Sequence, residues 1–333
     1  MADAAAPLLD VRGLTVAVHG IPRVRDLSFS VASGETLALV GESGSGKSLT
    51  GLAIMRLLPR AARLAGGVLH FADPSGAGVD LATIDESALR TIRGGRIAMV
   101  FQEPMTSLNP VLTVGAQIGE TLRIHAGLSA AAARRRAVEL LDLVRVPDPS
   151  RQVDEYPHRL SGGMRQRVMI AMAVACNPAL LIADEPTTAL DVTIQAQVLE
   201  LIDRLRRDLS MGVILITHDL GVVGQWADRV VVLYAGSKAE EARAETVFAD
   251  PRHPYTQGLI GASPRAAGRG GWRAGPLPEI PGSIADAPAE GCAFAPRCPH
   301  VRPSCRAARP PAIAVGPAHL AACPVLNPVE TAA

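Results

Sequence analysis

The residues best suited to chemistry in this chain are those of a glycine-rich loop. Residues 41–48, GESGSGKS, match the pattern G-x-x-x-x-G-K-S/T. In this pattern the glycines let backbone N–H groups face phosphate oxygens, and the start of the next helix favours negative charge. Lys47 and Lys238 are the only lysines among 33 lysines and arginines. An arginine at position 47 would place a larger, planar group in the loop instead of a compact ammonium. We expect Lys47 to reach the β- and γ-phosphates and Ser48 to bind Mg²⁺; the predicted nucleotide-binding residues here are Gly41, Ser43, Gly44, Ser45, Gly46, Lys47 and Ser48.

A pair of acids and two further polar residues follow short apolar runs. ALLIADEP delivers Asp184 to the end of a buried strand, where it can hold Mg²⁺ through water. Glu185 is then placed to polarise the attacking water as general base. Adjacent acids after a strand also cap helices, which Asp191 is expected to do in part. We expect His218, after VILIT, to sense the γ-phosphate. Gln102 is expected to bind at the ATP and Mg²⁺ site as a hinge that senses the γ-phosphate, although lone residues of these two types are more often structural or surface residues.

The string LSGGMRQR at residues 160–167 has a physical logic of its own. The Ser161 hydroxyl both donates and accepts, and Gly162 and Gly163 allow close approach to a phosphate. The helix predicted to begin there points its positive end outward. A serine and two glycines can also simply start a helix, but this string lies 23 residues before Asp184.

The elements that must position these residues form an α/β arrangement. Residues 8–35 alternate apolar and polar types, as antiparallel strands do. TLALV (36–40) is a continuous apolar run, as are 96–101, 179–183 and 213–217, and each ends at a glycine or a polar residue. This pattern predicts an open sheet that binds ligands at the carboxyl ends of its strands. Helical character dominates between Gln102 and Ser161.

Composition limits the function classes. The 333 residues favour about two domains. A formal net charge of +1 gives no electrostatic case for nucleic acid, and Arg134–Arg136 reads as a solvated helix face. No apolar stretch reaches the ~18 residues that span a bilayer, and the N-terminus lacks the basic region of a signal peptide. We expect a cytosolic chain that reaches a membrane only through partners.

Four of the five cysteines lie close together after residue 256, where proline, glycine and arginine become frequent. Cys292, Cys298, Cys305 and Cys323 have the spacing C-x5-C-x6-C-x17-C. Four thiolates suit tetrahedral zinc or an iron–sulfur cluster, and a metal could substitute for missing packing. Free thiols remain an alternative, and His300 and His319 are candidate substitute ligands. Cys176 lies in an apolar helix and is expected in the core.

With these residues in view, the chain resembles the ATP-binding subunits of ABC importers over essentially its whole length, and the oligopeptide/dipeptide (peptide/nickel) branch in particular. The resemblance rests on VFQEPMTSLNP (100–110), LSGGMRQRVMIAMAVACNPALLIADEPTTALDVT (160–193) and PRHPYTQGL (251–259). It implies a P-loop ATPase with a RecA-like core, an antiparallel β subdomain and an inserted helical subdomain at about 103–164. Residues 1–255 would form the nucleotide-binding domain, and residues 256–333 the cysteine-containing extension of this branch.

The resemblance also implies how the chain works. ATP and Mg²⁺ would be sandwiched between one chain's phosphate loop and the signature of a second ATPase. The signature residues of this chain, Ser161, Gly162, Gly163 and Gln166, would act on the ATP held by that partner. That second ATPase is expected to be a paralogue, and the pair would drive two permease subunits, fed by an extracytoplasmic binding protein, from the cytoplasmic face of the membrane. EPMTSLNP would receive the permease. Extensions of this kind resemble 4Fe–4S carriers, which puts that cluster before zinc.

Two points depart from the family pattern or stay open. The aromatic residue that usually stacks on adenine is absent from VAVHG, where Val18 or His19 stands instead. GSKAEEARAE (236–245) looks degraded against the usual strand-and-turn pattern. The alternatives to peptide import are import of nickel or glutathione by the same machinery, an ABC ATPase of DNA repair or translation, and an exporter cassette.

Overall fold

The computed structural model describes residues 6–72, 78–103, 107–188, 190–263 and 279–327. Its contacts divide the chain into two compact units. The first consists of Met1–Leu9, Val31–Glu35 and Phe71–Leu215, and the second of Asp10–Ser30, Thr36–His70 and Ile216–Ala333. The chain passes from the first unit to the second within β8 (Gly212–Thr217).

The second unit contains the phosphate loop and most of two sheets. β1 (Leu9–Val18) lies between β2 (Ile21–Val31) and β4 (Ala62–Phe71). His19 and Gly20 join β1 to β2 with φ of 50° and 80°, the geometry of a two-residue turn that suits antiparallel strands. The other sheet runs β11 (Ile313–Gly316), β12 (His319–Ala321), β10 (Ser237–Arg243), β9 (Arg229–Tyr234), β3 (Thr36–Val40).

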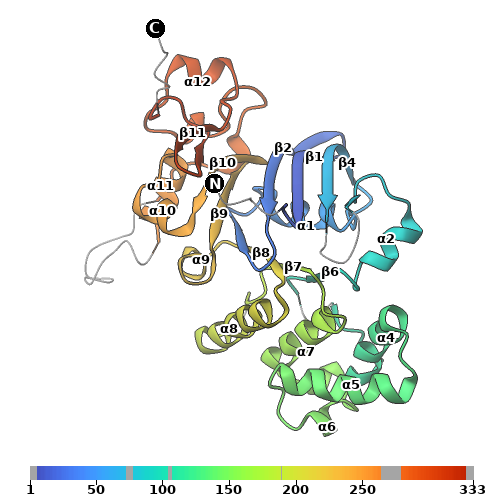
Figure 1. The fold of residues 1–333 in the computed structure, drawn as a ribbon. Coiled ribbons are helices and arrows are strands. Elements are labelled where there is room, and N and C mark those ends of the chain that lie inside the picture. Colours follow the sequence, from blue (N-terminus) through green and yellow to red (C-terminus); the bar gives the residue numbers. More distant parts are fainter. Residues whose placement is uncertain (1–5, 73–77, 104–106, 189, 264–278, 328–333) are drawn as a thin grey trace. The chain divides into compact units, whose positions relative to one another are not determined.

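β3 is parallel to β9, whereas β10 is antiparallel to both β9 and β12. GSKAEEARAE therefore contributes a strand to this sheet, with a register shift between Lys238 and Glu240. The helical elements among the described residues of this unit, labelled in part in Figure 1, are α1 (Lys47–Ile54), α9 (Leu220–Trp226), α10 (Ala244–Ala249), α11 (Pro254–Gly261), η3 (Ile284–Asp286), η4 (Ala295–Arg297) and α12 (Pro303–Ala307).

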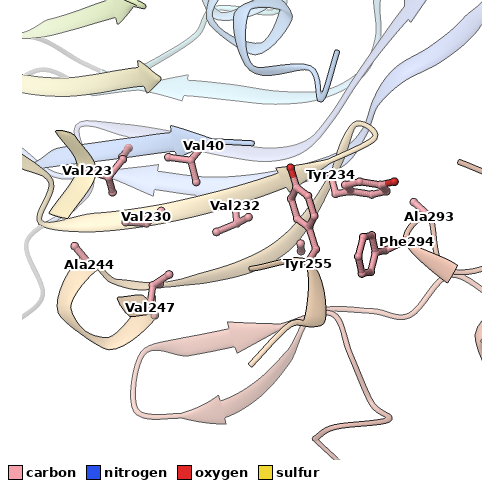
Figure 2. Packing of buried hydrophobic residues seen from close by; sticks show 13 residues of the cluster. Val40, Val223, Val230, Val232, Tyr234, Ala244, Val247, Tyr255, Ala293 and Phe294 are labelled. Carbon is pink, nitrogen blue, oxygen red and sulfur yellow. The ribbon is translucent and has the colours of Figure 1, made fainter. Parts of the chain in front are cut away.

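The core of the second unit draws residues from both sides of residue 256. Valines of β3 and β9 pack with Tyr255 of α11 and with Phe294, which precedes η4. The Tyr234 ring lies 4.6 Å from the Tyr255 ring and 5.2 Å from the Phe294 ring, centroid to centroid, in edge-on contacts (Figure 2). Aromatic side chains thus cover an apolar strand face that would otherwise meet water.

The first unit contains the helices expected between Gln102 and Ser161. Thr113, Ser129 and Ser161 each accept a backbone N–H at a helix start, as N-cap residues do. The caps begin α4 (Val114–Ala126), α5 (Ala130–Leu143) and α7 (Gly162–Val174), which contact one another (Figure 1). The unit also contains β5 (Val79–Asp80), α2 (Glu86–Ile92), β6 (Ile97–Val100), α6 (Pro149–Gln152), η1 (Pro157–Arg159), β7 (Leu180–Asp184) and α8 (Val192–Leu209).

Four of the buried strands match the apolar runs of the sequence. TLALV forms β3, and the runs at 96–101, 179–183 and 213–217 form β6, β7 and β8 within one or two residues at each end. Among the described residues, no helix is both long and apolar enough to cross a membrane.

Candidate functional site

The phosphate loop connects the buried strand β3 to helix α1 and can be built only with glycine at two positions. Gly41 has φ of 149°, and a Cβ there would lie 2.2 Å from the carbonyl oxygen of Leu233. Gly46, the N-cap of α1, has φ of 99° and would place a Cβ 3.1 Å from Val24. Glycine is the residue that adopts such angles without steric cost. The spacing of the sequence pattern is therefore also the spacing that the backbone requires.

The polar groups of this loop suit a bound anion. The Lys47 ammonium is buried and donates to the backbone oxygens of Gly41 (2.7 Å) and Glu42 (3.0 Å). The Ser45 side chain is fully buried, and its Oγ has no hydrogen-bond partner within the described part of the chain. Buried polar atoms are almost always paired. Phosphate oxygens at the start of α1 would supply the missing partner, so the residues present fit a nucleotide. Ser43 and Gly44 are exposed, and Ser48 is half-buried.

The carboxylates lie where two parallel strands of the first unit end. β6 pairs in parallel with β7, and Val100 is opposite Ala183. Asp184, the last residue of β7, is buried, whereas Glu185 follows it with φ of 46°. A non-glycine residue in this left-handed region carries strain, which gathers at functional sites.

Glu185 is joined to Gln102 at the neighbouring ends of β7 and β6. Gln102 Nε2 donates to Glu185 Oε2 at 3.1 Å, and Thr188 Oγ1 donates to the same oxygen at 2.8 Å. The sequence reasoning identified Gln102 and Glu185 separately but did not predict this contact, and it missed Thr188. The hydroxyl three residues after Glu185 was the only signal for it.

His218, Ser161, Gly162 and Gly163 lie at element ends, as predicted, whereas Gln166 lies inside α7. His218 is exposed directly after β8. Ser161 is exposed and caps α7 by accepting the N–H of Met164 at 3.3 Å. Gly162 is exposed, and a Cβ at Gly163 would lie 3.0 Å from Ile194. Gln166 differs from these residues because it is buried, and its Nε2 has no partner among the described residues.

At the turn expected to meet adenine, His19 is exposed and its backbone N–H donates to Ala61 O at 2.9 Å, while Val18 is half-buried.

Besides Thr188, a second residue found only in the structure is Gln117 of α4. Its buried amide bonds both the N–H (2.8 Å) and the oxygen (3.0 Å) of Asn109 and the oxygen of Leu112 (3.1 Å). These bonds fix the loop in which Val111 is 75% exposed.

The four cysteines of the extension line one cavity. Cys292, Cys298, Cys305 and Cys323 surround about 230 Å³ together with His300. Gly291 holds the chain here with φ of 73°, since a Cβ would lie 2.8 Å from Cys305 O, which also accepts the N–H of Cys292 at 2.7 Å. Burial raises the pKa of the Cys292 and Cys298 thiols.

The described residues contain no group of three or more His, Cys, Asp or Glu side chains placed to hold a metal ion. The four sulfurs share a cavity without forming a ready-made cage. His319 does not line this cavity; it is buried, and its Nε2 lies 2.7 Å from Oε1 of the buried Glu240. His300 does line the cavity. Cys176 is half-buried near Thr121 O, at 3.9 Å, rather than fully in the core.

A buried strand that leads through a glycine loop into a helix, with a buried lysine turned onto that loop, defines a P-loop nucleotide-binding protein. A carboxylate pair after a second strand is what such proteins use for hydrolysis.

Comparison with known proteins narrows this class. The ABC transporter family profile matches residues 24–188, and the profile of the oligopeptide/dipeptide transporter C-terminal region matches residues 239–305. A protein of Brucella melitensis biotype 1 named "Putative peptide import ATP-binding protein" is 52% identical over 95% of this chain and 96% of its own length. A Brucella abortus protein with the same description is 51% identical over 98% and 97%.

Solved structures agree with these matches. The ATP-binding cassette MJ0796, in a dimeric post-hydrolysis state with ADP and Pi, is 28% identical and has a TM-score of 0.62 over 71% of this chain and 98% of its own. CbiO1 of Clostridium perfringens, part of an ABC transporter complex, is 25% identical with a TM-score of 0.61 over 73% and 91%.

The chain belongs to the ABC transporter family and has the ATP-binding cassette fold expected from its motifs. It is an ATPase that uses ATP and Mg²⁺ to drive transport, and it works with membrane permease subunits.

Proposed function

We propose that this chain hydrolyses ATP to power the import of di- and oligopeptides. The observation that carries the proposal is the match of residues 239–305 to the oligopeptide/dipeptide transporter C-terminal region, downstream of the cassette match in the same chain. The names of the relatives at 51–52% identity support the same cargo. Nickel and glutathione are the competing cargoes.

The roles of the site residues follow from their chemistry. Lys47 and the backbone N–H groups of the loop bind the phosphates, while Ser48 and Asp184 serve Mg²⁺. Glu185 is the general base, with Gln102 bonded to its carboxylate, and His218 senses the γ-phosphate. The signature residues Ser161, Gly162, Gly163 and Gln166 act on the ATP of a partner ATPase. The exposure of Ser161 and Gly162 supports this role, whereas Gln166 must first become accessible.

The proposed partners are a paralogous ATPase, two permease subunits and an extracytoplasmic binding protein, with this chain on the cytoplasmic face of the membrane. The apolar side chains of Val111 and Leu112 are 75% and 39% exposed on the loop that Gln117 fixes. This loop directly follows the proposed permease contact, EPMTSLNP (103–110), of which residues 104–106 lie outside the described part of the chain. We further propose a nucleotide-binding domain at 1–255 with a helical subdomain at about 103–164, and an extension at 256–333; α4, α5 and α6 lie within the helical range.

The test is to purify the tagged chain from detergent-solubilised membranes of its own cell, identify the partners, and reconstitute the assembly in vesicles with its binding protein. We expect short peptides to stimulate ATP hydrolysis. The Lys47→Ala assembly is the control, since it should show no stimulation. Stimulation by Ni²⁺ or glutathione instead of peptide would overturn the cargo, and recovery of the chain without permease subunits would overturn the import role.

We also propose that Cys292, Cys298, Cys305 and Cys323 bind a 4Fe–4S cluster, with zinc as the alternative. Their shared cavity supports this proposal, and four thiolates are the usual ligand set of such a cluster. Metal binding deprotonates thiols, which would offset the raised pKa of Cys292 and Cys298.

Protein purified without oxygen should absorb visible light and contain about four irons per chain, as expected for this cluster type. Cys298→Ser should lose the iron, while Cys176→Ser, outside the cavity, should keep it. Stoichiometric zinc without iron would show that the four cysteines bind zinc instead of a 4Fe–4S cluster. Metal-free protein would show that they are free thiols.

A further inference from the structure

Glu42, the second residue of the phosphate loop, is bonded by two residues that are far away in the sequence. Its backbone N–H donates to Tyr255 Oη at 2.8 Å, and its carboxylate Oε2 accepts from Arg297 Nη1 at 2.9 Å. Its backbone oxygen accepts from the Lys47 ammonium at 3.0 Å and from the N–H of Ser45 at 3.1 Å. Glu42 therefore joins the lysine of the loop to α11 and to the extension.

Arg297 is itself held firmly. Its side chain is 5% exposed. Nε donates to Pro281 O at 2.7 Å, and Nη2 donates to Ile280 O at 3.0 Å. Nη1 also reaches Tyr234 Oη at 3.3 Å, and the guanidinium carbon lies 5.7 Å from the centre of that ring. Because backbone oxygens fix one side of the planar fork, the direction of Nη1 toward Glu42 is also fixed.

Tyr255 gives the backbone of Glu42 an equally fixed partner. The residue is fully buried in the aromatic cluster of Figure 2, edge-on to Tyr234. Burial raises the pKa of its phenol, so the group stays neutral at physiological pH. A buried hydroxyl that already accepts an N–H leaves little freedom for Glu42 to move, since breaking the bond would strand two polar groups.

We infer that Arg297 and Tyr255 are positioning residues for ATP binding, which act by holding Glu42 and, through its backbone oxygen, Lys47. The inference rests on the proposed role of residues 41–48 as the phosphate-binding loop. A loop with glycines at 41, 44 and 46 loses much conformational freedom on binding. Contacts that fix it beforehand reduce that loss and raise affinity.

This role differs from merely attaching the extension to the unit. Arg297 would keep Ile280, Pro281 and Tyr234 as partners without Glu42, and Phe294 and Ala293 lie in the core independently of the ion pair. Fixing the loop affects the affinity for ATP, whereas attachment affects the stability of the extension. The two effects are measured separately.

The experiment compares the full chain with Arg297→Met, Arg297→Lys, Tyr255→Phe and Glu42→Gln, by KM and kcat for ATP and by the thermal unfolding midpoint. Losing a charged hydrogen bond should raise KM about tenfold in Arg297→Met, with kcat nearly unchanged. Arg297→Lys should recover part of the affinity. The double variant Arg297→Met/Glu42→Gln should be no worse than Arg297→Met alone, because both changes act on the same interaction.

Arg309→Met is the matched control. Arg309 is a partly buried arginine of the same extension, but it donates to Ser237 Oγ (2.6 Å) and Ala289 O (3.4 Å) instead of the loop. It should keep the wild-type KM. An unchanged KM in a folded Arg297→Met protein, equal increases in Arg297→Met and Arg309→Met, or additive losses in the double variant would each overturn the inference.

Two further outcomes separate this inference from the proposed function. If Arg297→Met does not fold, Glu42→Gln and Tyr255→Phe decide. Glu42→Gln removes the charge of the contact with Arg297, Tyr255→Phe removes the hydrogen bond to the Glu42 N–H, and both leave the other partners of Arg297 in place. If Lys47→Ala binds ATP as the wild type does, the loop assignment fails and the inference fails with it. If Lys47→Ala loses ATP and the Arg297, Tyr255 and Glu42 variants do not, only the inference is overturned.

Discussion

Replacing Glu185 by glutamine tests the chemistry of the site with little change to its shape. Gln102 and Thr188 both donate to Oε2 of Glu185. A glutamine has one carbonyl oxygen that can take this place, so both hydrogen bonds can persist. What is lost is the negative charge that makes the side chain a base. We therefore expect stability to change by about 1 kcal/mol or less, the difference between charged and neutral hydrogen bonds at such a position.

The expected effect on hydrolysis is much larger. A positioned general base contributes about 10²–10⁴-fold in rate, which corresponds to roughly 3–5 kcal/mol of activation free energy at 1.36 kcal/mol per factor of ten. Glu185→Gln should therefore release phosphate at least about 100-fold more slowly in single-turnover experiments with radiolabelled ATP. Its Kd for ATP, measured by equilibrium binding, should stay within a few-fold of the wild type.

Thr188→Val is the control for this experiment. It removes one hydrogen bond to Glu185 but keeps the carboxylate charge. Because the bond is exposed and screened by water, its loss should cost about 1 kcal/mol, so the rate should fall by only about fivefold. Turnover in Glu185→Gln within twofold of the wild type would refute the assignment of Glu185 as base. Equal losses in Glu185→Gln and Thr188→Val would show that orientation of the loop, and not the charge, sets the rate.

Two other predictions follow from the second unit. Lys47→Ala removes an ammonium that donates to two carbonyl oxygens of the loop. The Kd for ATP should rise about 100-fold or more, because two charge-assisted bonds to phosphate are lost. Unchanged affinity would contradict the phosphate-loop assignment. Burial lowers the pKa of His253 to about 4, so its contribution to stability is present above pH 6.5, where the unfolded residue is also neutral, and falls as the pH drops from 6.5 toward 4. At pH 5 the loss amounts to about 2 kcal/mol of the free energy of unfolding. His253→Asn, which can still cap α11, should lose less stability than the wild type as the pH falls. If both proteins lose stability in parallel, protonation of His253 is not the cause of the acid-side loss.

Much of the site was predictable because short apolar runs place its residues. TLALV, ALLIA and VILIT are each long enough for one buried strand, and the next residue must leave the apolar layer. Gly41, Asp184 and His218 therefore fall at or just after strand ends, as predicted. Their mutual contacts were less predictable. The bond between Gln102 and Glu185 depends on the pairing of β6 with β7, which joins segments about 80 residues apart.

The strand β10 shows why a polar segment can be misread. GSKAEEARAE looks degraded against the family's strand-and-turn pattern, yet Glu240 and Glu241 are buried in a strand whose register shifts between Lys238 and Glu240. Glu240 accepts from the backbone of Arg252 (2.8 Å) and His253 (2.9 Å) and contacts His319. A buried carboxylate is tolerated only with such partners, and these partners come from other parts of the chain. Local sequence patterns hold no information about them.

The same reasoning applies to the extension. Its proline, glycine and arginine content correctly indicates few apolar residues for a core of its own, but Phe294 and Ala293 fill the core of the unit that holds the phosphate loop. Arg297, three residues later, is bonded to Glu42 across 255 positions. A cassette that ended near residue 255 would expose the apolar surface under Phe294 and leave the Glu42 carboxylate without its arginine. The extension is thus part of the environment in which the phosphate loop takes its shape, and nucleotide affinity should depend on residues that the loop's own sequence pattern does not contain.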